Sequence, residues 1–402
     1  MIIPHIKTET FNYNLPQDRI AKYPLPQRNH SKLLVYHNRI IEESTFHEIY
    51  RFIPSNYLLV FNDTKVLPAR ILFQKETGAN IEVFLLEPFM PNDYAQIFNT
   101  HNTCQWLCMV GNAKKWRKNI ILHKSLNING EVLLIKANKI SSQDNASVIE
   151  FTWNNHIPFS EILNAVGKIP IPPYLKRESE PIDLERYQTV FSKYLGSVAA
   201  PTASLHFTDE EFNHFIEKNI QTTYLTLHVG AGTFKPMTSQ YIHEHSLHTE
   251  LFQISQQTLK QIIHHYPNIV AVGTTVLRSL ESIYHVGNYL LNNNGTLINE
   301  VSQWCEYDIS IKNNPLYAMQ SMLTYLEHHS LEKINIRTQL MISPGYQIKM
   351  ANGLITNFHQ PQSSLLALVA AFTGNDWKML YDYALSHQFR FLSYGDSSLL
   401  WK

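Results

Sequence analysis

The segment IVAVGTTVLRSLESIY, residues 269–284, carries the pattern that decides the fold. Four consecutive apolar residues, Ile269–Val272, predict a strand that is buried on both faces. A glycine turn at Gly273 follows, and residues 276–284 then have the spacing of an amphipathic helix. A strand that leads through a tight turn into a helix is the repeating unit of a parallel sheet covered by helices.

The same alternation continues in both directions along the chain. Further strands are expected at 32–36, 57–61, 223–229 and 353–358. Further helices are expected at 17–22, 160–166, 209–218, 255–265, 363–372 and 376–387. Because strands and helices alternate, we expect an α/β fold with a largely parallel sheet.

Residues 69–153 have a different texture. Short β-rich runs are separated there by Gly, Asn, Asp and Pro, at 81–86, 105–110, 119–123, 132–136 and 147–153. This spacing predicts a small β-barrel or sandwich inserted into the main domain. We therefore expect an α/β domain formed by 1–68 and 154–402, with an inserted barrel at 69–153. The polar, asparagine-rich stretch 288–333, which surrounds an expected helix at 316–328, is interpreted as an extra segment rather than core.

The composition sets mild bounds on function. Among the 402 residues, Lys and Arg total 33 and Asp and Glu total 33, so no global charge attracts nucleic acid. The three cysteines, Cys104, Cys108 and Cys305, form no disulfide or metal-binding spacing, which fits a reducing compartment. The N-terminus lacks the features of a signal peptide, and the apolar stretch 365–372 is far shorter than the roughly 20 residues of a membrane span. We expect a soluble, cytoplasmic monomer without a membrane or protein partner.

One local basic patch stands out. Trp116 lies among Lys114, Lys115, Arg117 and Lys118. Such a turn either binds a polyanion or is an ordinary exposed, lysine-rich turn. We predict that the four cations contribute to any RNA-binding surface.

Ligands of open α/β sheets bind at the carboxyl ends of the strands, and four expected strand ends carry small or polar residues. They are Asn62–Thr64, the segment HVGAGTF at 228–234, Gly273–Thr275 and Thr356–His359. The glycine turn at 228–234 does not open a helix, because Lys235-Pro236 follows, so a dinucleotide or methyl-donor motif is disfavoured. Its glycines favour close approach of backbone amides to a ligand. At Thr274, the helix amides either hold an anion or the threonine simply caps the helix.

The segment YQTVFSKYLGSVAAPTASLH, residues 187–206, combines small residues with polar ones. Its glycine and alanines leave room beside the backbone, and Ser197, Thr202, Ser204 and His206 offer hydroxyls and an imidazole. The segment is therefore a candidate ligand-lined turn, with a Pro-punctuated loop as the alternative.

Histidines are concentrated near these strand ends. His243, His245 and His248 lie close to Glu244 and Glu250, but neither a tetrahedral ligand set nor a His-Glu-x-x-His motif is present, so no metal is expected. We interpret His206, His228, His248 and His359 as hydrogen-bonding or proton-transfer groups, because imidazole titrates near neutral pH. The alternative for each of them is a structural histidine.

Together these segments resemble the S-adenosylmethionine:tRNA ribosyltransferase-isomerases of queuosine biosynthesis. The matching motifs cover nearly the whole chain in order: LPQDRIAKYPLPQR (15–28), FNDTKVLPAR (61–70), GKIPIPPY (167–174), ERYQTVFS (185–192), GSVAAPTASLHFT (196–208), LHVGAGTFKP (227–236), EHSLHTE (244–250), VGTTVLRSLES (272–282), PGYQIK (344–349), LITNFHQPQSSLL (354–366) and FRFLSYGDS (389–397).

The resemblance implies a large α/β domain with an inserted β-barrel. It also implies transfer of the ribosyl part of S-adenosylmethionine to an aminomethyl-deazaguanine at the tRNA wobble position, giving epoxyqueuosine while adenine and methionine leave. S-Adenosylmethionine is then a substrate, and no metal is required. On this basis the expected catalytic residues are His206, His228, His248 and Arg278. The expected substrate-binding residues are Asn62, Thr64, Arg70, Ser197, Thr202, Gly230, Gly232, Thr233, Thr274, Thr275, Asn357 and His359.

The chain departs from the family pattern at five positions. The family usually has glycine at Ser204, arginine at Lys65, serine at Val276, aspartate at Asn352 and glutamate at Gln362. Two missing carboxylates leave a second interpretation open, namely a diverged paralogue that binds RNA without catalysis or acts on another substrate. A third interpretation is methyl transfer from the same donor.

Overall fold

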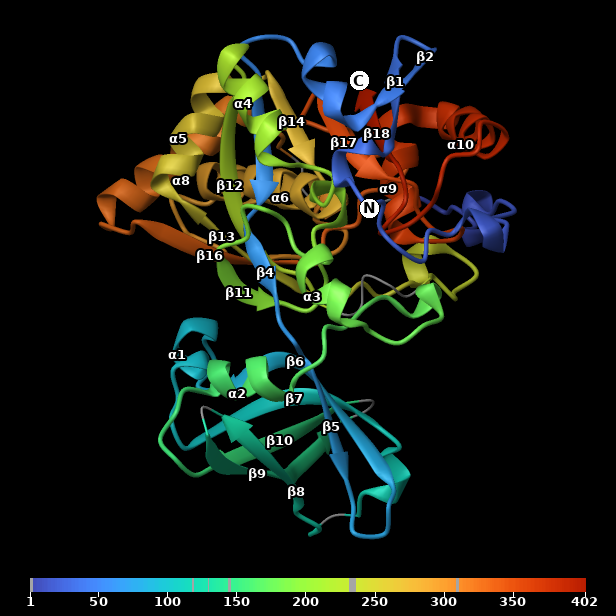
Figure 1. The fold of residues 1–402 in the computed structure, drawn as a ribbon. Coiled ribbons are helices and arrows are strands. Elements are labelled where there is room, and N and C mark those ends of the chain that lie inside the picture. The colour runs from blue at the N-terminus through green and yellow to red at the C-terminus, as the bar shows by residue number, and fades with distance from the viewer. Residues whose placement is uncertain (1–2, 118, 129, 144–145, 231–235, 309–310) are drawn as a thin grey trace.

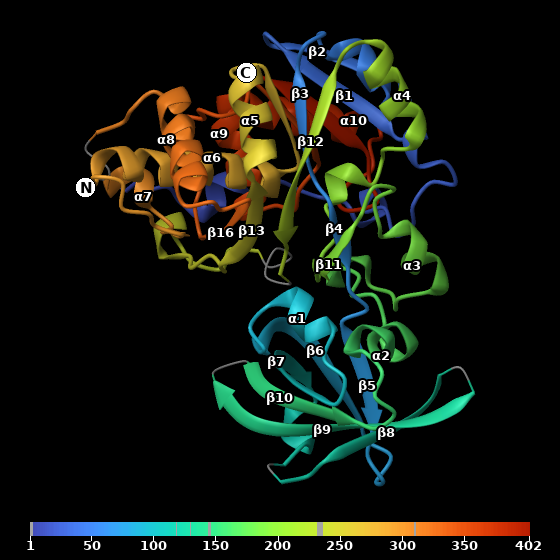
Figure 2. The same cartoon turned by 90° about the vertical axis from the view of Figure 1, so that its left-hand side faces the viewer.

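The computed structural model describes residues 3–402 apart from 118, 129, 144–145, 231–235 and 309–310. The chain forms a large α/β part and, beneath it in Figure 1, a smaller part built on an antiparallel sheet. Figure 2, turned by 90°, shows the same separation of the two parts. The helices of the described residues fall short of the length and hydrophobicity that a membrane crossing requires.

A ten-stranded mixed sheet forms the centre of the α/β part. Its strands are β1 (Lys32–His37), β2 (Ile40–Thr45), β3 (Leu58–Asn62), β12 (Gln221–His228), β13 (Glu250–Ser255), β14 (Ile269–Val272), β15 (Glu300–Val301), β16 (Lys333–Thr338), β17 (Gly353–Asn357) and β18 (Ser397–Trp401). Their order is β15-β16-β13-β12-β3-β14-β17-β18-β1-β2. The four central strands, β12, β3, β14 and β17, run parallel to one another, so their carboxyl ends meet at one edge. This confirms the expected α/β class.

Helices cover both faces of the central strands. The main ones are α4 (Asp209–Glu217), α5 (Gln256–His265), α6 (Thr274–Asn292), α8 (Pro315–His328), α9 (Ser364–Thr373) and α10 (Trp377–Ser386). Alternate residues of β3 reach opposite faces: Leu58 and Val60 pack in the cluster that includes α5, α6, α8 and α9. Leu59 and Phe61 pack with α4 and the 3-10 helix η4 (Phe46–Phe52). Burial on both faces explains why these strands are continuous apolar runs.

The smaller part is a six-stranded antiparallel sheet that curls into a nearly closed barrel. Its strands are β5 (Arg70–Gln74), β6 (Asn80–Met90), β7 (Thr103–Gly111), β8 (Leu122–Ile128), β9 (Glu131–Gln143) and β10 (Ala146–Trp153), in the order β5-β6-β7-β10-β9-β8. Lys124 Nζ on β8 donates to the carbonyl of Leu72 on β5 at 2.8 Å, which brings the two edge strands together. The barrel expected from the sequence is therefore confirmed.

The domain boundaries stay a prediction, and the packing suggests one refinement. Helix α2 (Phe159–Val166) buries Phe159, Ile162 and Leu163 in the barrel core. Because these residues lie beyond the predicted boundary at 153, we propose that the barrel unit ends after α2.

Two expectations about local structure are wrong, and two elements were not expected. Residues 17–22 do not form an α-helix but contain a short 3-10 turn, η2 (Gln17–Arg19), because Pro24 and Pro26 follow closely. Trp116 is buried in the barrel core, so it is not part of an exposed basic-aromatic patch. Strand β18 and the short helix α1 (Tyr94–Phe98) were not anticipated.

The asparagine-rich stretch 288–333 is not peripheral, contrary to the interpretation above. Helix α6 continues into it as far as Asn292, and α8 packs against α6. Ala318, Met319, Met322 and Leu326 of α8 lie in the main hydrophobic cluster. The helix expected at 316–328 is therefore present as α8, but the polar composition around it concealed that its apolar face belongs to the core.

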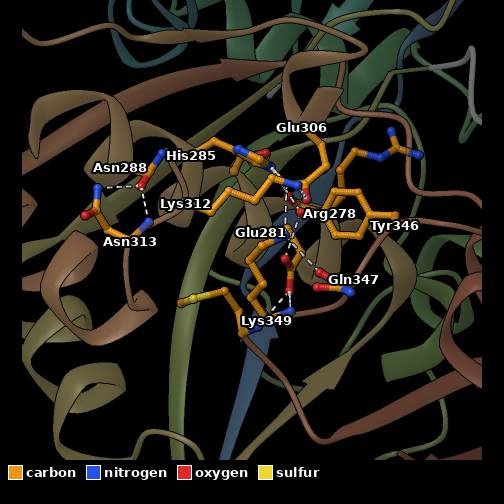
Figure 3. A network of polar contacts seen from close by, with 12 residues as sticks. Arg278, Glu281, His285, Asn288, Glu306, Lys312, Asn313, Tyr346, Gln347 and Lys349 are labelled. Carbon is orange, nitrogen blue, oxygen red and sulfur yellow. Dashed lines mark hydrogen bonds and ion pairs between the residues drawn. The ribbon is translucent and has the colours of Figure 1, made fainter. Parts of the chain in front are cut away.

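Helix α6 also carries a polar stripe inside the protein. Thr274, Arg278, Glu281, His285 and Asn288 recur at intervals of three and four residues, so they share one face of the helix, and all are buried. Figure 3 shows how this stripe meets Tyr346, Lys349 and Glu306. The helix is therefore fixed in rotation and position by polar contacts as well as by packing.

At Gly287, on α6, the backbone of α8 approaches closely. A Cβ atom at this position would lie 2.0 Å from the carbonyl oxygen of Ala318. We predict that Gly287→Ala lowers the free energy of unfolding by at least about 1–3 kcal/mol, because the two helices must separate. Urea unfolding measures this, with Leu291→Ala, an exposed position of the same helix, as a control expected to change it by less than about 0.5 kcal/mol. Equal unfolding curves for Gly287→Ala and the unchanged protein would contradict this packing.

Candidate functional site

A pocket opens at the edge of the sheet where the central parallel strands end. Three segments form its wall: 199–203 after β11 (Tyr194–Ser197), 273–275 after β14, and 356–360 at the end of β17. Part of the wall consists of residues with small side chains or none, which leaves space for a ligand next to the backbone. They are Ala199, Ala200, Ala203 and Gly273. The sequence-predicted residues Thr202, Thr274, Thr275, Asn357 and His359 all line this pocket.

The N-terminus of α6 faces the pocket. Gly273 occupies the N-cap position with φ 105°, a conformation that favours glycine, and no described side chain caps the helix. Thr274 is therefore the first helical residue rather than the cap that the sequence allowed. The first amides of a helix of this length, together with its dipole, favour an anionic or electron-rich ligand group.

Asn357 is held by a buried histidine. Its Nδ2 donates to His206 Nε2 at 3.2 Å and to the carbonyl of Leu392 at 3.3 Å. Because His206 Nε2 accepts, its proton resides on Nδ1 and is donated to Ser31 Oγ at 2.8 Å. Burial, with the nearby Arg390 charge, lowers the pKa of His206 to about 3, so this imidazole is neutral. Oδ1 of Asn357 is buried without a donor among the described residues.

His359 is fixed on several sides. Its Nε2 lies 2.9 Å from Thr356 Oγ1, its backbone N–H donates to Tyr381 Oη at 2.9 Å, and its carbonyl accepts from Tyr13 Oη at 2.5 Å. Burial lowers the pKa of His359 to about 3. It therefore contributes a neutral, immobile polar group to the pocket wall.

His228 lies next to the pocket, at the end of β12, but faces a second depression. This depression, the barrel cleft, lies between the outer face of β12, β13 and β16 and residues 86–99 of the smaller part. His228 and Gly230 line the barrel cleft, whereas Val229 between them lines the pocket. The imidazole stacks on Tyr94 of α1 with ring centroids 4.1 Å apart.

The tautomer of His228 follows from its hydrogen bond to the backbone of Gly196. Nδ1 lies 3.0 Å from the carbonyl oxygen of Gly196, so Nδ1 carries the proton and Nε2 keeps its lone pair. Burial lowers the pKa of His228 to about 4. A Cβ at Gly196 would lie 2.2 Å from His228 Nδ1, and φ there is 154°, so only glycine fits this contact.

Arg278 and His248 are joined through one buried carboxylate. Glu250 on β13 accepts from Arg278 Nη1 at 3.2 Å through Oε2, and its Oε1 lies 3.2 Å from His248 Nε2. A Cβ on Gly230 would lie 3.7 Å from the His248 ring, so the chain after β12 passes beside it. This triad connects α6, β13 and the end of β12.

The remaining predicted residues have structural partners and do not line the pocket themselves. Asn62 Oδ1 accepts from the amides of Thr64 and Leu227, both at 3.0 Å, which joins β3 to β12. Ser197 Oγ donates to the carbonyl of Ala199 at 2.7 Å, Thr64 Oγ1 donates to the carbonyl of Tyr194 at 3.3 Å, and Arg70 pairs with Glu82 in the barrel. Gly232 and Thr233 lie outside the described residues.

Sequence reasoning missed four polar residues of the pocket wall: Tyr174, Gln360, Ser363 and Ser393. Tyr174 could have been found from the sequence, because it ends the rigid, Pro-rich segment 167–174. Its Oη lies 2.5 Å from Ser393 Oγ, which closes one side of the pocket. Among the described residues, His, Cys, Asp and Glu side chains do not gather in groups of three or more that would hold a metal ion.

The two missing carboxylates lie outside the pocket wall. Gln362 donates from Nε2 to Glu9 Oε2 at 2.8 Å, and its backbone joins Phe11 and Met237. Asn352 follows Ala351 before β17, where its backbone pairs with Ile269 and Lys402. Neither residue lines the pocket, so the substitutions do not remove a charge from its wall.

Known proteins are similar to this chain over nearly its whole length. A family model described as "Queuosine biosynthesis protein" matches residues 8–400. A Halothermothrix orenii protein named S-adenosylmethionine:tRNA ribosyltransferase-isomerase is 34% identical, and the match covers 98% of this chain and all of that protein. A Legionella pneumophila (strain Paris) protein of the same name is 36% identical, with 98% and 99% covered.

Among solved structures, the crystal structure of an S-adenosylmethionine tRNA ribosyltransferase from Thermotoga maritima matches with a TM-score of 0.45 at 25% identity, covering 97% of this chain and 99% of that one. The family match over nearly the whole length, together with relatives well above 30% identity, shows that the chain belongs to the queuosine biosynthesis protein family.

Proposed function

We propose that this protein is an S-adenosylmethionine-dependent tRNA ribosyltransferase-isomerase. It transfers the ribosyl part of S-adenosylmethionine to the aminomethyl-deazaguanine at the wobble position of a tRNA and rearranges it, giving epoxyqueuosine. Adenine and methionine leave. The observation that carries the proposal is the pocket itself, because small residues, helix amides and neutral polar groups meet at the carboxyl ends of the parallel strands.

The pocket suits an uncharged, hydrogen-bonding part of a nucleoside. Thr202, Thr274 and Thr275 offer hydroxyls, and Asn357 offers an amide whose orientation His206 fixes. Oriented dipoles of this kind stabilise developing negative charge better than mobile water does. Because the alanines and Gly273 of the wall have small side chains or none, a planar ring system can come close to the backbone.

We infer that His228 is the group that accepts a proton during the reaction. A sulfonium acidifies the neighbouring ribose carbon, so a modest base suffices to start the rearrangement. Of the four candidate histidines, His206 has both ring nitrogens hydrogen-bonded within the protein, whereas His228 keeps an Nε2 lone pair. His228 also lies where the pocket and the barrel cleft meet.

Two alternatives remain distinguishable by experiment. A non-catalytic RNA-binding protein would bind tRNA without releasing a product. A methyltransferase would leave methylated RNA and no adenine. The positions of Asn352 and Gln362 outside the pocket wall favour catalysis over the first alternative.

The first prediction concerns the products. Incubation with S-adenosylmethionine and tRNA that carries the aminomethyl-deazaguanine is expected to release adenine and methionine in amounts equal to the modified nucleoside. Chromatography with mass spectrometry measures all three, and tRNA with an unmodified guanine is the control. Methylated RNA, or tRNA binding without adenine release, would contradict the proposal.

The second prediction concerns His228 and pH. Because burial lowers its pKa to about 4, the imidazole stays neutral and able to accept a proton as the pH falls from 8 to about 5.5. The single-turnover rate of adenine release is therefore expected to stay level over this range, whereas an ordinary histidine base would lose half its activity near its reference pKa of about 6.5. His228→Ala is expected to slow this step about 100-fold or more. His329→Ala, at an exposed position directly after α8, is the control.

A loss of activity centred near pH 6.5 would point instead to an unburied histidine. Unchanged turnover in His228→Ala would remove His228 from the mechanism.

The third prediction tests the two departures from the family pattern. The double variant Asn352→Asp, Gln362→Glu restores the usual carboxylates, yet neither position lines the pocket. Its rate of adenine release is expected to stay within about threefold of the unchanged protein, a difference of under about 0.7 kcal/mol. A gain of 100-fold or more would show that the carboxylates belong to the reaction.

A further inference from the structure

The floor of the barrel cleft is one face of three neighbouring strands. Side chains alternate across a strand, so every second residue of β12, β13 and β16 points to the same side. The pairing aligns Thr226 with Gln253 and Gln253 with Asn335, and in the next row His228 with Leu251 and Leu251 with Arg337. His228 and Arg337 are therefore two strands apart, about 10 Å at the usual strand spacing.

Three cations border this floor outside any ion pair between described residues. Lys193 next to β11, together with Lys333 and Arg337 on β16, lines the barrel cleft, and none of the three forms an ion pair with a described residue. Two carboxylates also line it, and one of them, Asp93, accepts from the amide of Gln96 at 2.9 Å as the cap of α1. The rest of the polar lining consists mainly of amides and hydroxyls, which bind bases and sugars without a charge cost.

An exposed aromatic ring lies among these cations. Tyr194 is 48% exposed and lines the barrel cleft, and Lys193 Nζ lies 5.1 Å from the centre of its ring. An exposed aromatic beside basic residues is the arrangement on which proteins stack an unpaired base. Tyr94, by contrast, already stacks on His228.

We propose that the barrel cleft holds the single-stranded loop of the acceptor RNA, with Tyr194 stacked on a base and Lys193, Lys333 and Arg337 on backbone phosphates. This inference rests on the proposed function, which supplies the RNA. It explains how two substrates of very different size meet. The donor occupies the pocket, the loop occupies the barrel cleft, and the two adjoin at residues 228–230.

The described cations of the basic turn, Lys114, Lys115 and Arg117, belong to a separate surface at the opposite end of the barrel. The sequence predicts that this turn contributes to RNA binding, whereas the present proposal assigns the phosphate contacts to the barrel cleft instead. Asn112 Nδ2, next to that turn, donates to the carbonyl of Asn80 at 3.0 Å, at the start of β6. Pro88, which lines the barrel cleft, lies eight residues further along the same strand. At about 3.3 Å per residue the two ends are about 25 Å apart. The turn therefore provides a matched control.

The experiment compares two triple charge reversals, K193E/K333E/R337E in the barrel cleft and K114E/K115E/R117E in the turn. All six side chains are at least partly exposed, so folding is expected to persist, and thermal melting checks this. Binding of precursor-containing tRNA is followed by fluorescence anisotropy between 50 and 200 mM salt. The cleft variant is expected to bind at least tenfold more weakly, and its salt slope to fall by about 2, at about 0.7 per single-strand phosphate contact.

The turn variant is expected to keep its affinity within about twofold and its salt slope unchanged. Tyr194→Ala is expected to weaken tRNA binding at least about fivefold, and Tyr194→Phe to restore it. Affinity for S-adenosylmethionine alone, measured by calorimetry, is expected to stay unchanged in all these variants.

The outcomes separate this inference from the proposed function. If the unchanged protein binds tRNA and releases adenine, but the cleft variant binds as tightly, the inference is overturned and the function stands. Equal weakening by both triple variants also overturns it. If the unchanged protein does not bind tRNA at all, the proposed function and the inference fail together.

Discussion

The structure depends on one buried helix whose polar stripe is completed by other segments. Isolated charges inside a protein are costly, so Arg278 and Glu281 are tolerated in α6 only because each has a polar partner. Arg278 binds Glu250 of β13, and Glu281 accepts from Tyr346 Oη at 2.8 Å and from the amides of Lys349 and Met350 at 2.9 and 2.7 Å. Burial raises the pKa of Glu281, while these donors and the Lys349 charge oppose that shift.

The same stripe fixes the protonation state of its histidine. Tyr346 gives its only proton to Glu281, so His285 Nε2, 3.0 Å away, must donate to the tyrosine oxygen. His285 is then neutral, in agreement with a pKa that burial lowers to about 3. Since the first turn of α6 forms part of the pocket, these contacts, about one to three turns further along the helix, also set where Gly273–Thr275 lie.

Two kinds of feature could be predicted from the sequence: strands and helices with a clear local periodicity, and pocket residues that directly follow a strand. Strand β14 was predicted residue by residue, because four apolar residues before a glycine have few other structures, and the strand-end rule found Thr274, Asn357 and His359. Prediction from the sequence failed where a side chain's role depends on distant segments. Asn62 resembles a ligand-binding residue, yet its amide joins two strands. His228 comes within two strands of Arg337 only through the order β12-β13-β16. Strand order is a long-range property that a local pattern does not contain.

At the end of β12, the alternation of side chains along the strand places neighbouring residues at two different surfaces, the pocket and the barrel cleft. Neighbouring side chains of a strand point to opposite faces, so Leu227 and Val229 are buried while His228 faces outward between them. Val229 borders the pocket, and its backbone N–H donates to Ser197 Oγ at 3.0 Å. Gly196 then allows the carbonyl that orients His228 to come close enough for a hydrogen bond. The position of His228, the proposed proton acceptor, in the barrel cleft beside the pocket thus needs only one strand end, one glycine and one stacked tyrosine.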